Sequence, residues 1–210
     1  MNFGLTDEQE LIRRTVRDFA ESRVAPVAEE LDLEARFPYE LVAELAELGL
    51  MGLPIPEEYG GAGGDTVSNA IAIEELTRID SSVAITVAAH TSLGTMPIYL
   101  FGTEEQKREW LPRLASGEGL AAFGLTEAGA GSDAGATLTK ASLIDGEWVI
   151  DGSKIFITNA GTDISACVTI TAVTGDGEIS NIIVPNGTPG YEISAPMKKL
   201  GWHASDTREL

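Results

Sequence analysis

The pattern of apolar residues changes near residue 118, and this change limits the possible folds more than any other feature of the sequence. Before it, apolar residues recur at helical spacing, and capping boxes at 6–9 and 103–106 are typical of helix starts. After it, Thr, Val and Ile become frequent, and Asp-Gly pairs at 145–146 and 151–152 separate alternating segments. Asp-Gly in that setting is a strong hairpin signal, so we expect strands to follow the helices.

These patterns predict an α+β multidomain fold. We expect an N-terminal all-α helical domain over 1–118 and a β-barrel-like middle domain over 119–210. Pro26 is expected to kink or break the first helix. The other helices are expected from Pro38 to Gly49, from a cap at Asp65 or Thr66, from a cap at Ser81 or Ser82 to about Leu100, and from 103 to about Ala115, with further strands at 165–173, 181–184 and 191–194.

Composition and charge exclude several classes of protein. The 210 residues hold 33 Asp and Glu against 14 Lys and Arg, so the net charge is −19 and there is no basic stripe for nucleic acid. No uncharged apolar run predicts a membrane span, and residues 1–10 lack a secretory-signal pattern. The single cysteine, Cys167, fits a reducing, cytoplasmic location. The acid excess indicates either a solvated acidic surface or adaptation to high salt.

The glycine-rich run "EAGAGSDAGA" at 127–136 is the best candidate for ligand contact. Residues 129–134 match the dinucleotide pattern G-x-G-x-x-G/A, but that pattern must open a helix, and here hairpin strands follow. Glycine lets main-chain N–H groups approach a ligand closely, and Thr126 and Ser132 add hydroxyl groups. The residues alone therefore predict either an anion-binding nest or a plain tight turn.

Five segments, in the same order and at similar separations, make the chain resemble the acyl-CoA dehydrogenases. The resemblance covers essentially all 210 residues and agrees with the helix-then-strand order. The segments are "PEEYGGAGGD" at 56–65, "GTEEQKREWLPRLASGE" at 102–118, "FGLTEAGAGSD" at 123–133, "DGSKIFITNAG" at 151–161 and "KKLGWHASDTREL" at 198–210.

The resemblance implies an FAD-dependent oxidation of the Cα–Cβ bond of an acyl-CoA thioester to a trans-2-enoyl-CoA. In that family a carboxylate removes the α-proton while the β-hydrogen leaves as hydride to flavin N5. The electrons then pass to an electron-transferring flavoprotein. Family members are homo-oligomers, commonly tetramers, so acyl-CoA, the electron-transferring flavoprotein and further copies of the chain are the implied partners.

The resemblance also assigns cofactor contacts to two segments of the expected β domain. In the first, Thr126 would bond the polar edge of the flavin ring, and Ser132 would meet the pyrophosphate and lie beside bound substrate. In the second, the family commonly has Trp where this chain has Phe156, which keeps an apolar face but loses the indole N–H. The complete implied set is Phe123, Leu125, Thr126, Gly131, Ser132, Phe156, Ile157 and Thr158.

Three residues of the fourth expected helix are implied on the substrate side. His90, Thr91 and Leu93 correspond to positions that line the acyl pocket in the family. A lone histidine on an apolar helix is more often a structural residue, and that alternative stays open for His90. The chain departs from the family at His203-Ala204, where relatives often carry an arginine, so no role is assigned there.

The resemblance assigns no catalytic residue and no metal ligand to this chain. In the family the catalytic glutamate lies on a second helical domain, which would follow the last residue, Leu210. Glu127 is interpreted as a carboxylate that fixes its loop. The expectation for the 210 residues is therefore little or no dehydrogenase activity. Two alternatives remain: a short non-catalytic flavin-binding or interaction protein, and a flavin oxidase or monooxygenase of the same fold.

Overall fold

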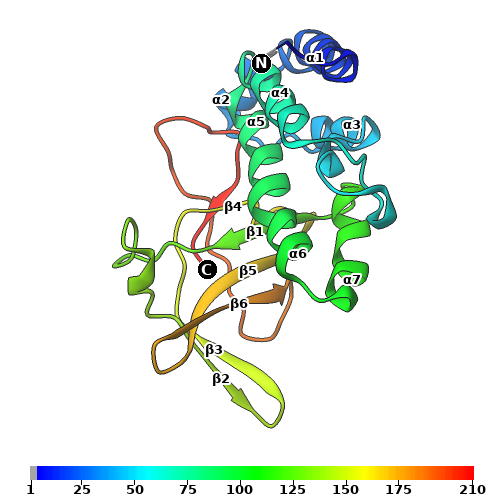
Figure 1. The fold of residues 1–210 in the computed structure, drawn as a ribbon. Helices are drawn as coiled ribbons and strands as arrows, with labels where there is room; N and C mark the ends of the chain where they lie inside the picture. The colour runs from blue at the N-terminus through cyan, green and yellow to red at the C-terminus, as the bar shows by residue number, and fades with distance from the viewer. Residues whose placement is uncertain (1–3) are drawn as a thin grey trace. The chain divides into compact units, whose positions relative to one another are not determined.

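The computed structural model describes residues 4–210, and its contacts divide the chain into two compact units. The first three residues, which belong to the stretch without a secretory-signal pattern, lie outside the described part. One unit, here the helical unit, holds the residues up to 119 together with 198–205, and the β unit holds 120–197 together with 206–210. The expected order of a helical domain followed by a β domain is confirmed (Figure 1).

Several helices of the helical unit begin at a residue whose side chain caps the first turn. Both predicted capping boxes form, at 6–9 and at 103–106, and Asp65 caps its helix by accepting from the Ser68 N–H at 2.7 Å. The helices are α1 (Asp7–Phe19), α2 (Ala28–Glu34), α3 (Tyr39–Glu47), α4 (Thr66–Thr77), α5 (Ser81–Ala88), α6 (Met96–Phe101) and α7 (Glu104–Ala115), with π-helical turns at Ala20–Val24 and Ala89–Thr95.

One predicted cap was wrong. Neither Ser81 nor Ser82 caps α5, because the Asp80 carboxylate accepts from the Ser82 N–H at 2.6 Å and from the Val83 N–H at 3.3 Å. Aspartate is as good a cap as serine, and it stands one residue earlier. The predicted break near Pro26 is confirmed, since α1 runs into a π-helical turn and α2 begins only at Ala28.

The continuous helical run Ser81–Phe101 is long and apolar enough to cross a membrane, judged by length and composition alone. More than half of its most apolar window is buried inside the protein, and a core helix meets the same criterion. The core of this unit is formed by fully buried side chains that α1, α3, α4 and α7 contribute together with the segments between them. These include Val16, Leu31, Leu45, Met51, Leu76, Leu111 and Leu114.

The β unit is built around one long, almost fully buried strand, β5 (Ser165–Gly175). It pairs in parallel with β1 (Leu120–Gly124), meets the first residue of β2 (Lys140–Ile144), and pairs antiparallel with β6 (Glu178–Pro185). β2 continues into β3 (Glu147–Asp151) through the predicted turn at Asp145-Gly146. The sheet order β1-β5-β2-β3, with β6 on the other side of β5, is open, so the barrel-like sheet does not close.

Two predicted β features were wrong. Asp151-Gly152 is not a hairpin turn, because β3 pairs only with β2, and β4 (Ile157–Thr158) pairs with β7 (Thr207–Arg208). Gly152 serves a different purpose, since a Cβ there would lie 2.5 Å from the Thr139 hydroxyl oxygen. The segment 191–194 is not a strand. It does lie beside β7, since the Ser194 N–H donates to the Glu209 carbonyl at 2.9 Å and the Met197 N–H donates to the Thr207 carbonyl at 3.0 Å.

Residues 198–205 belong to the helical unit, whereas the expected β domain over 119–210 had included them. Trp202 donates its indole N–H to the Ser81 hydroxyl at 2.8 Å, and His203 Nδ1 lies 3.0 Å from the Asp32 carboxylate. The hydrogen bond to Asp32 raises the pKa of His203.

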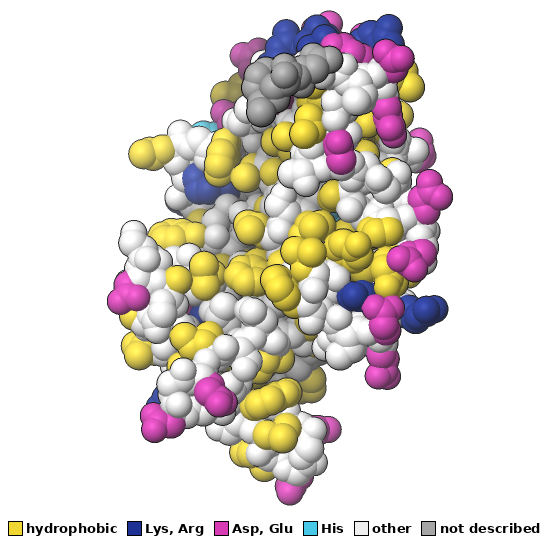
Figure 2. All heavy atoms as spheres, viewed as in Figure 1, with side chains coloured by type: hydrophobic (Ala, Val, Ile, Leu, Met, Phe, Trp, Pro, Cys, Tyr) yellow, Lys and Arg dark blue, Asp and Glu magenta, His cyan; other side chains and the backbone are white. Residues whose placement is uncertain are grey.

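Asp and Glu side chains are scattered over the face shown in Figure 2, in keeping with the net charge of −19.

Candidate functional site

The glycine-rich segment after β1 forms a closed turn with an exposed continuation. Glu127 and Ala130 exchange both main-chain hydrogen bonds, at 3.0 and 3.1 Å, which places Ala128 and Gly129 at the tip. Gly131 and Ser132 follow on the exposed side. A Cβ added at Gly129 or Gly131 would meet nothing within 4 Å. The protein itself therefore leaves these backbone positions open, as a site for close approach of a ligand requires.

The carboxylate of Glu127 holds the two ends of this loop together. It accepts hydrogen bonds from the Thr137 hydroxyl, from the Leu138 N–H at 2.7 Å and from the Thr139 N–H at 3.0 Å. Burial would raise the pKa of the Glu127 carboxyl, but hydrogen bonds from Lys154, Thr137 and Thr139 outweigh burial and hold the pKa far below its usual range. Both carboxylate oxygens of Glu127 are thus engaged in holding the two ends of the loop.

Lys154 is the cation that compensates this carboxylate, and sequence reasoning missed it. Its side chain is 2% exposed, and its ammonium lies 2.7 Å from Glu127 Oε1. The same ammonium donates to the Leu125 carbonyl at 3.1 Å, to the Thr137 hydroxyl at 2.9 Å and to the Thr171 hydroxyl at 3.0 Å. Its only sequence signal is a single charge within the apolar segment "SKIFIT". Buried lysines are rare unless they are paired. Through these acceptors Lys154 connects the glycine-rich loop to β5 and to its own segment, which leads into residues 156–158.

The two segments implied by resemblance are neighbours in the β unit. The Ile155 N–H donates to the Thr126 carbonyl at 2.8 Å. The residues just before β4 are therefore hydrogen-bonded to the residues just after β1. Thr126 and Thr158 are both half-buried. The structure therefore brings the first segment, 123–132, against the second, 156–158, although 23 residues separate them in sequence.

β4 is flanked by two residues with left-handed backbones. Phe156 and Asn159 both have φ of 65°. For a bulky residue such as Phe this conformation costs of order 1–3 kcal/mol and persists only where the surroundings enforce it. The Phe156 ring is 64% exposed, so packing against the protein core does not account for it. This edge therefore presents an exposed aromatic ring on a strained backbone, two residues before the half-buried Thr158.

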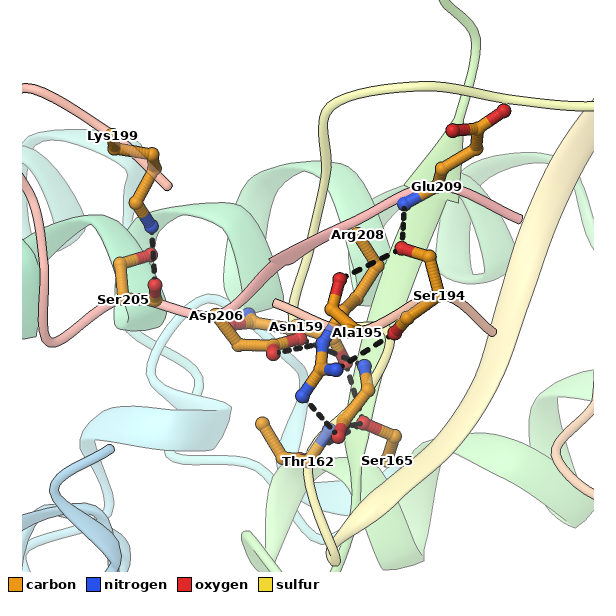
Figure 3. A network of polar contacts seen from close by, with 11 residues as sticks. Asn159, Thr162, Ser165, Ser194, Ala195, Lys199, Ser205, Asp206, Arg208 and Glu209 are labelled. Carbon is orange, nitrogen blue, oxygen red and sulfur yellow. Dashed lines mark hydrogen bonds and ion pairs between the residues drawn. The ribbon is translucent and has the colours of Figure 1, made fainter. Parts of the chain in front are cut away.

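A polar network joins the segments that follow β4 and surround β7 (Figure 3). The Arg208 guanidinium donates to the Asp206 carboxylate at 2.5 Å, to the Ser194 carbonyl at 2.8 Å and to the Gly161 carbonyl at 3.0 Å. Asp206 in turn accepts from the Gly161 N–H at 2.8 Å. A Cβ at Gly161 would lie 2.3 Å from Arg208 Nε, so only glycine allows this approach. The fork fixes the chain on both sides of the short β4–β7 pair.

The substrate-side residues implied by resemblance lie in the helical unit, and two of them are completely buried. His90 and Thr91 are 0% exposed. His90 Nε2 lies 3.0 Å from the Leu114 carbonyl, and the Thr91 hydroxyl donates to the Val87 carbonyl at 3.0 Å. Burial lowers the pKa of His90 to about 4, and main-chain hydrogen bonds oppose this only partly. This placement favours the structural alternative for His90, whereas Leu93 is half exposed.

The fold and this site together define a class: an α-helical unit followed by an open β unit that carries a clamped, glycine-rich, open-faced loop. Residues 6–118 match the family profile described as "Acyl-CoA dehydrogenase, N-terminal domain", and residues 122–210 match "Acyl-CoA dehydrogenase, middle domain". The chain therefore belongs to the acyl-CoA dehydrogenase family.

The proteins that this chain resembles are longer than the chain itself. A probable acyl-CoA dehydrogenase of Bacillus subtilis, YngJ, is 51% identical over all of this chain and 56% of its own length. Butyryl-CoA dehydrogenase from Megasphaera elsdenii has a TM-score of 0.94 and 41% identity, covering 100% of this chain and 56% of its own. An acyl-CoA dehydrogenase complexed with FAD from Bacillus anthracis has a TM-score of 0.90 and 41% sequence identity. The match covers 98% of this chain and 35% of that one. The chain thus spans about half the length of the curated relatives it matches.

Proposed function

We propose that these 210 residues form the FAD-binding part of an enzyme that oxidises the Cα–Cβ bond of an acyl-CoA thioester to a trans-2-enoyl-CoA. The observation that carries the proposal is the Ile155–Thr126 hydrogen bond at 2.8 Å, which joins both cofactor segments beside an open glycine loop. The FAD complex of the Bacillus anthracis relative supports the choice of cofactor. Bound FAD supplies the acceptor for the hydride that leaves the acyl chain.

The chain's own residues would bind and orient the cofactor from one edge of the β unit. Thr126 and Thr158 offer hydroxyl groups to the polar edge of the flavin ring, and Phe156 offers an exposed aromatic face. Gly131 leaves the main chain open for a pyrophosphate, and Ser132 adds an exposed hydroxyl there. Phe123, Leu125 and Ile157, which are half-buried or buried, support the ring from the protein side.

The substrate side is proposed more narrowly than the resemblance implied. Leu93 and Ser132 have exposed side chains and are proposed as acyl-CoA contacts. His90 and Thr91 are not, because neither side chain reaches the surface. An electron-transferring flavoprotein as acceptor, further copies of the chain as oligomer partners and a cytoplasmic location complete the proposal.

The 210 residues alone are expected to bind FAD weakly and to turn over no acyl-CoA. The open face of the loop is formed, but no carboxylate in the two cofactor segments is available as a base, since Glu127 is buried and clamped. The measurement is a visible spectrum of the purified chain titrated with FAD, followed by addition of butyryl-CoA without oxygen. A shifted flavin band without bleaching is expected. Bleaching by the thioester would contradict the inactivity, and an unshifted band at saturating FAD would contradict the cofactor site.

Replacing Gly131 with Ala is expected to leave the stability unchanged within about 0.5 kcal/mol, because the added methyl group meets no protein atom. It should weaken FAD binding about tenfold, since the methyl group would occupy the space of a phosphate oxygen. Gly201→Ala is the matched control, because Gly201 is equally open but lies outside the loop. Equal FAD affinities of both variants, measured by flavin fluorescence, would remove Gly131 from the site.

A further inference from the structure

We infer that Lys154 and Thr137 are positioning residues that hold the glycine-rich loop in its binding geometry before any ligand arrives. The role of the loop in cofactor binding rests on the proposed function, whereas the hydrogen-exchange test below does not. Both side chains are buried, Lys154 at 2% and Thr137 at 5% exposure, and neither reaches the open face of the loop. They act on the cofactor only through the main chain that they hold.

The ammonium of Lys154 joins the entrance of the loop to its exit. At the entrance it bonds the Leu125 carbonyl and the Glu127 carboxylate, and at the exit it bonds the Thr137 hydroxyl. The Thr137 hydroxyl in turn donates to Glu127, so the three side chains form a closed triangle beneath the loop. Every chemical group of this triangle is engaged, which makes the geometry specific rather than adaptable.

The bond to Leu125 also sets the direction of a main-chain donor. In a planar trans peptide the N–H points opposite to the preceding C=O. Because the Leu125 carbonyl is directed at the buried ammonium, the Thr126 N–H is directed away from it. The Thr126 carbonyl is occupied by the Ile155 N–H at 2.8 Å, so this strip of main chain cannot rotate independently. Lys154 thus fixes the Leu125–Thr126 peptide, and Ile155 fixes the next one, on either side of the Thr126 side chain that the proposed function places at the flavin edge.

The same ammonium provides an internal control for this inference. It also donates to the Thr171 hydroxyl at 3.0 Å, almost the same distance as to Thr137 at 2.9 Å. Thr171 is 7% exposed and lies on β5, and the hydrogen bond that joins its hydroxyl to this cluster is the one from Lys154. Removing either hydroxyl takes one acceptor from Lys154, but only the Thr137 change opens the triangle beneath the loop.

The test compares Thr137→Val with Thr171→Val, in the whole chain, by hydrogen exchange of the Ala130 and Ala136 amides, which are hydrogen-bonded within the loop at 3.1 and 3.2 Å. We expect Thr137→Val to speed this exchange about tenfold, the effect of one net hydrogen bond, and Thr171→Val to leave it unchanged at a similar global stability. Thr137→Ser, which keeps the hydroxyl, should restore slow exchange. If Thr137→Val does not fold, Thr137→Ala against Thr137→Ser carries the same comparison. Equal exchange in the Val variants would overturn the inference.

A second readout connects the loop to the cofactor. FAD affinity should fall in Thr137→Val relative to Thr171→Val, although neither side chain reaches the open face. An affinity loss shared equally by both variants would contradict the positioning role. If the unaltered chain binds no FAD at all, the proposed function fails while the exchange comparison still decides whether Lys154 and Thr137 hold the loop.

Discussion

Replacing Lys154 with Met is expected to destabilise the β unit by about 3–5 kcal/mol, the usual cost of removing one partner from a buried ion pair. The variant leaves the Glu127 carboxylate, which is 8% exposed, without its cation. Domains of this size are commonly stable by about 5–15 kcal/mol, so the loss is a large fraction of the total. Urea unfolding followed by circular dichroism, analysed at an unchanged denaturant slope, gives the difference directly.

Two comparisons show whether the loss comes from the uncompensated charge. Arg17→Met removes a cation 2.6 Å from the buried Glu75, but Arg78 remains at 2.7 Å and Arg17 is 40% exposed. Its cost should be clearly smaller than that of Lys154→Met, because solvent screens an exposed pair. The double variant Glu127→Leu/Lys154→Met removes both charges and should recover most of the stability. A Lys154→Met protein within about 1 kcal/mol of the unaltered chain would show that the pair is not energetically buried.

Acidification is expected to cost the helical unit about 3 kcal/mol between pH 6.5 and pH 4, through His90 alone. Burial lowers the pKa of His90 to about 4 in the folded protein, against about 6.5 in the unfolded chain. The unfolded chain therefore binds a proton in this window while the folded chain does not. Stability is complete above pH 6.5 and falls as the pH drops toward 4. Denaturant midpoints measured across this range give the slope.

His90→Gln is the variant that isolates this effect. Glutamine retains an N–H donor for the Leu114 carbonyl but does not titrate, so the slope between pH 6.5 and pH 4.5 should flatten. The only other histidine, His203, has a raised pKa and acts in the opposite direction, since its contribution is lost as the pH rises through that pKa. His203→Gln should therefore steepen the acid loss. An identical slope in His90→Gln and the unaltered chain would refute the role of His90.

Prediction from sequence succeeded where the deciding contacts are local. The capping boxes at 6–9 and 103–106 and the turn at 145–146 depend on residues within about one turn of each other. It failed at Asp151-Gly152, where the same dipeptide does not make a hairpin. There the outcome depends on β4 choosing β7, about 50 residues away, as its partner. The Asp80 cap was missed for a smaller reason, because two serines next to it are equally good cap residues.

The cofactor loop shows the same division at the site. Its position, its glycines and Ser132 could be read from the sequence, because the spacing of small residues is itself the signal. The role of Lys154 could not be predicted, because a lysine usually occupies a solvent-exposed position. Its burial is stable here because four acceptors from different segments surround the ammonium. His90 shows the reverse: the resemblance implied a substrate contact, and the packing around it leaves no exposed surface.

Residue patterns were enough to predict the order of a helical and a β unit, the starts of several helices, the place of the glycine-rich loop and the family. These depend on periodicity, on helix caps and on motif spacing. Periodicity and caps act over a few residues, and a motif is recognised directly from its residue types and their spacing. Three features became visible only in the folded chain: Lys154 compensates Glu127, Phe156 has a left-handed backbone, and residues 198–205 join the helical unit. Such features arise from burial and from contacts across tens of residues, whose partners no local pattern specifies.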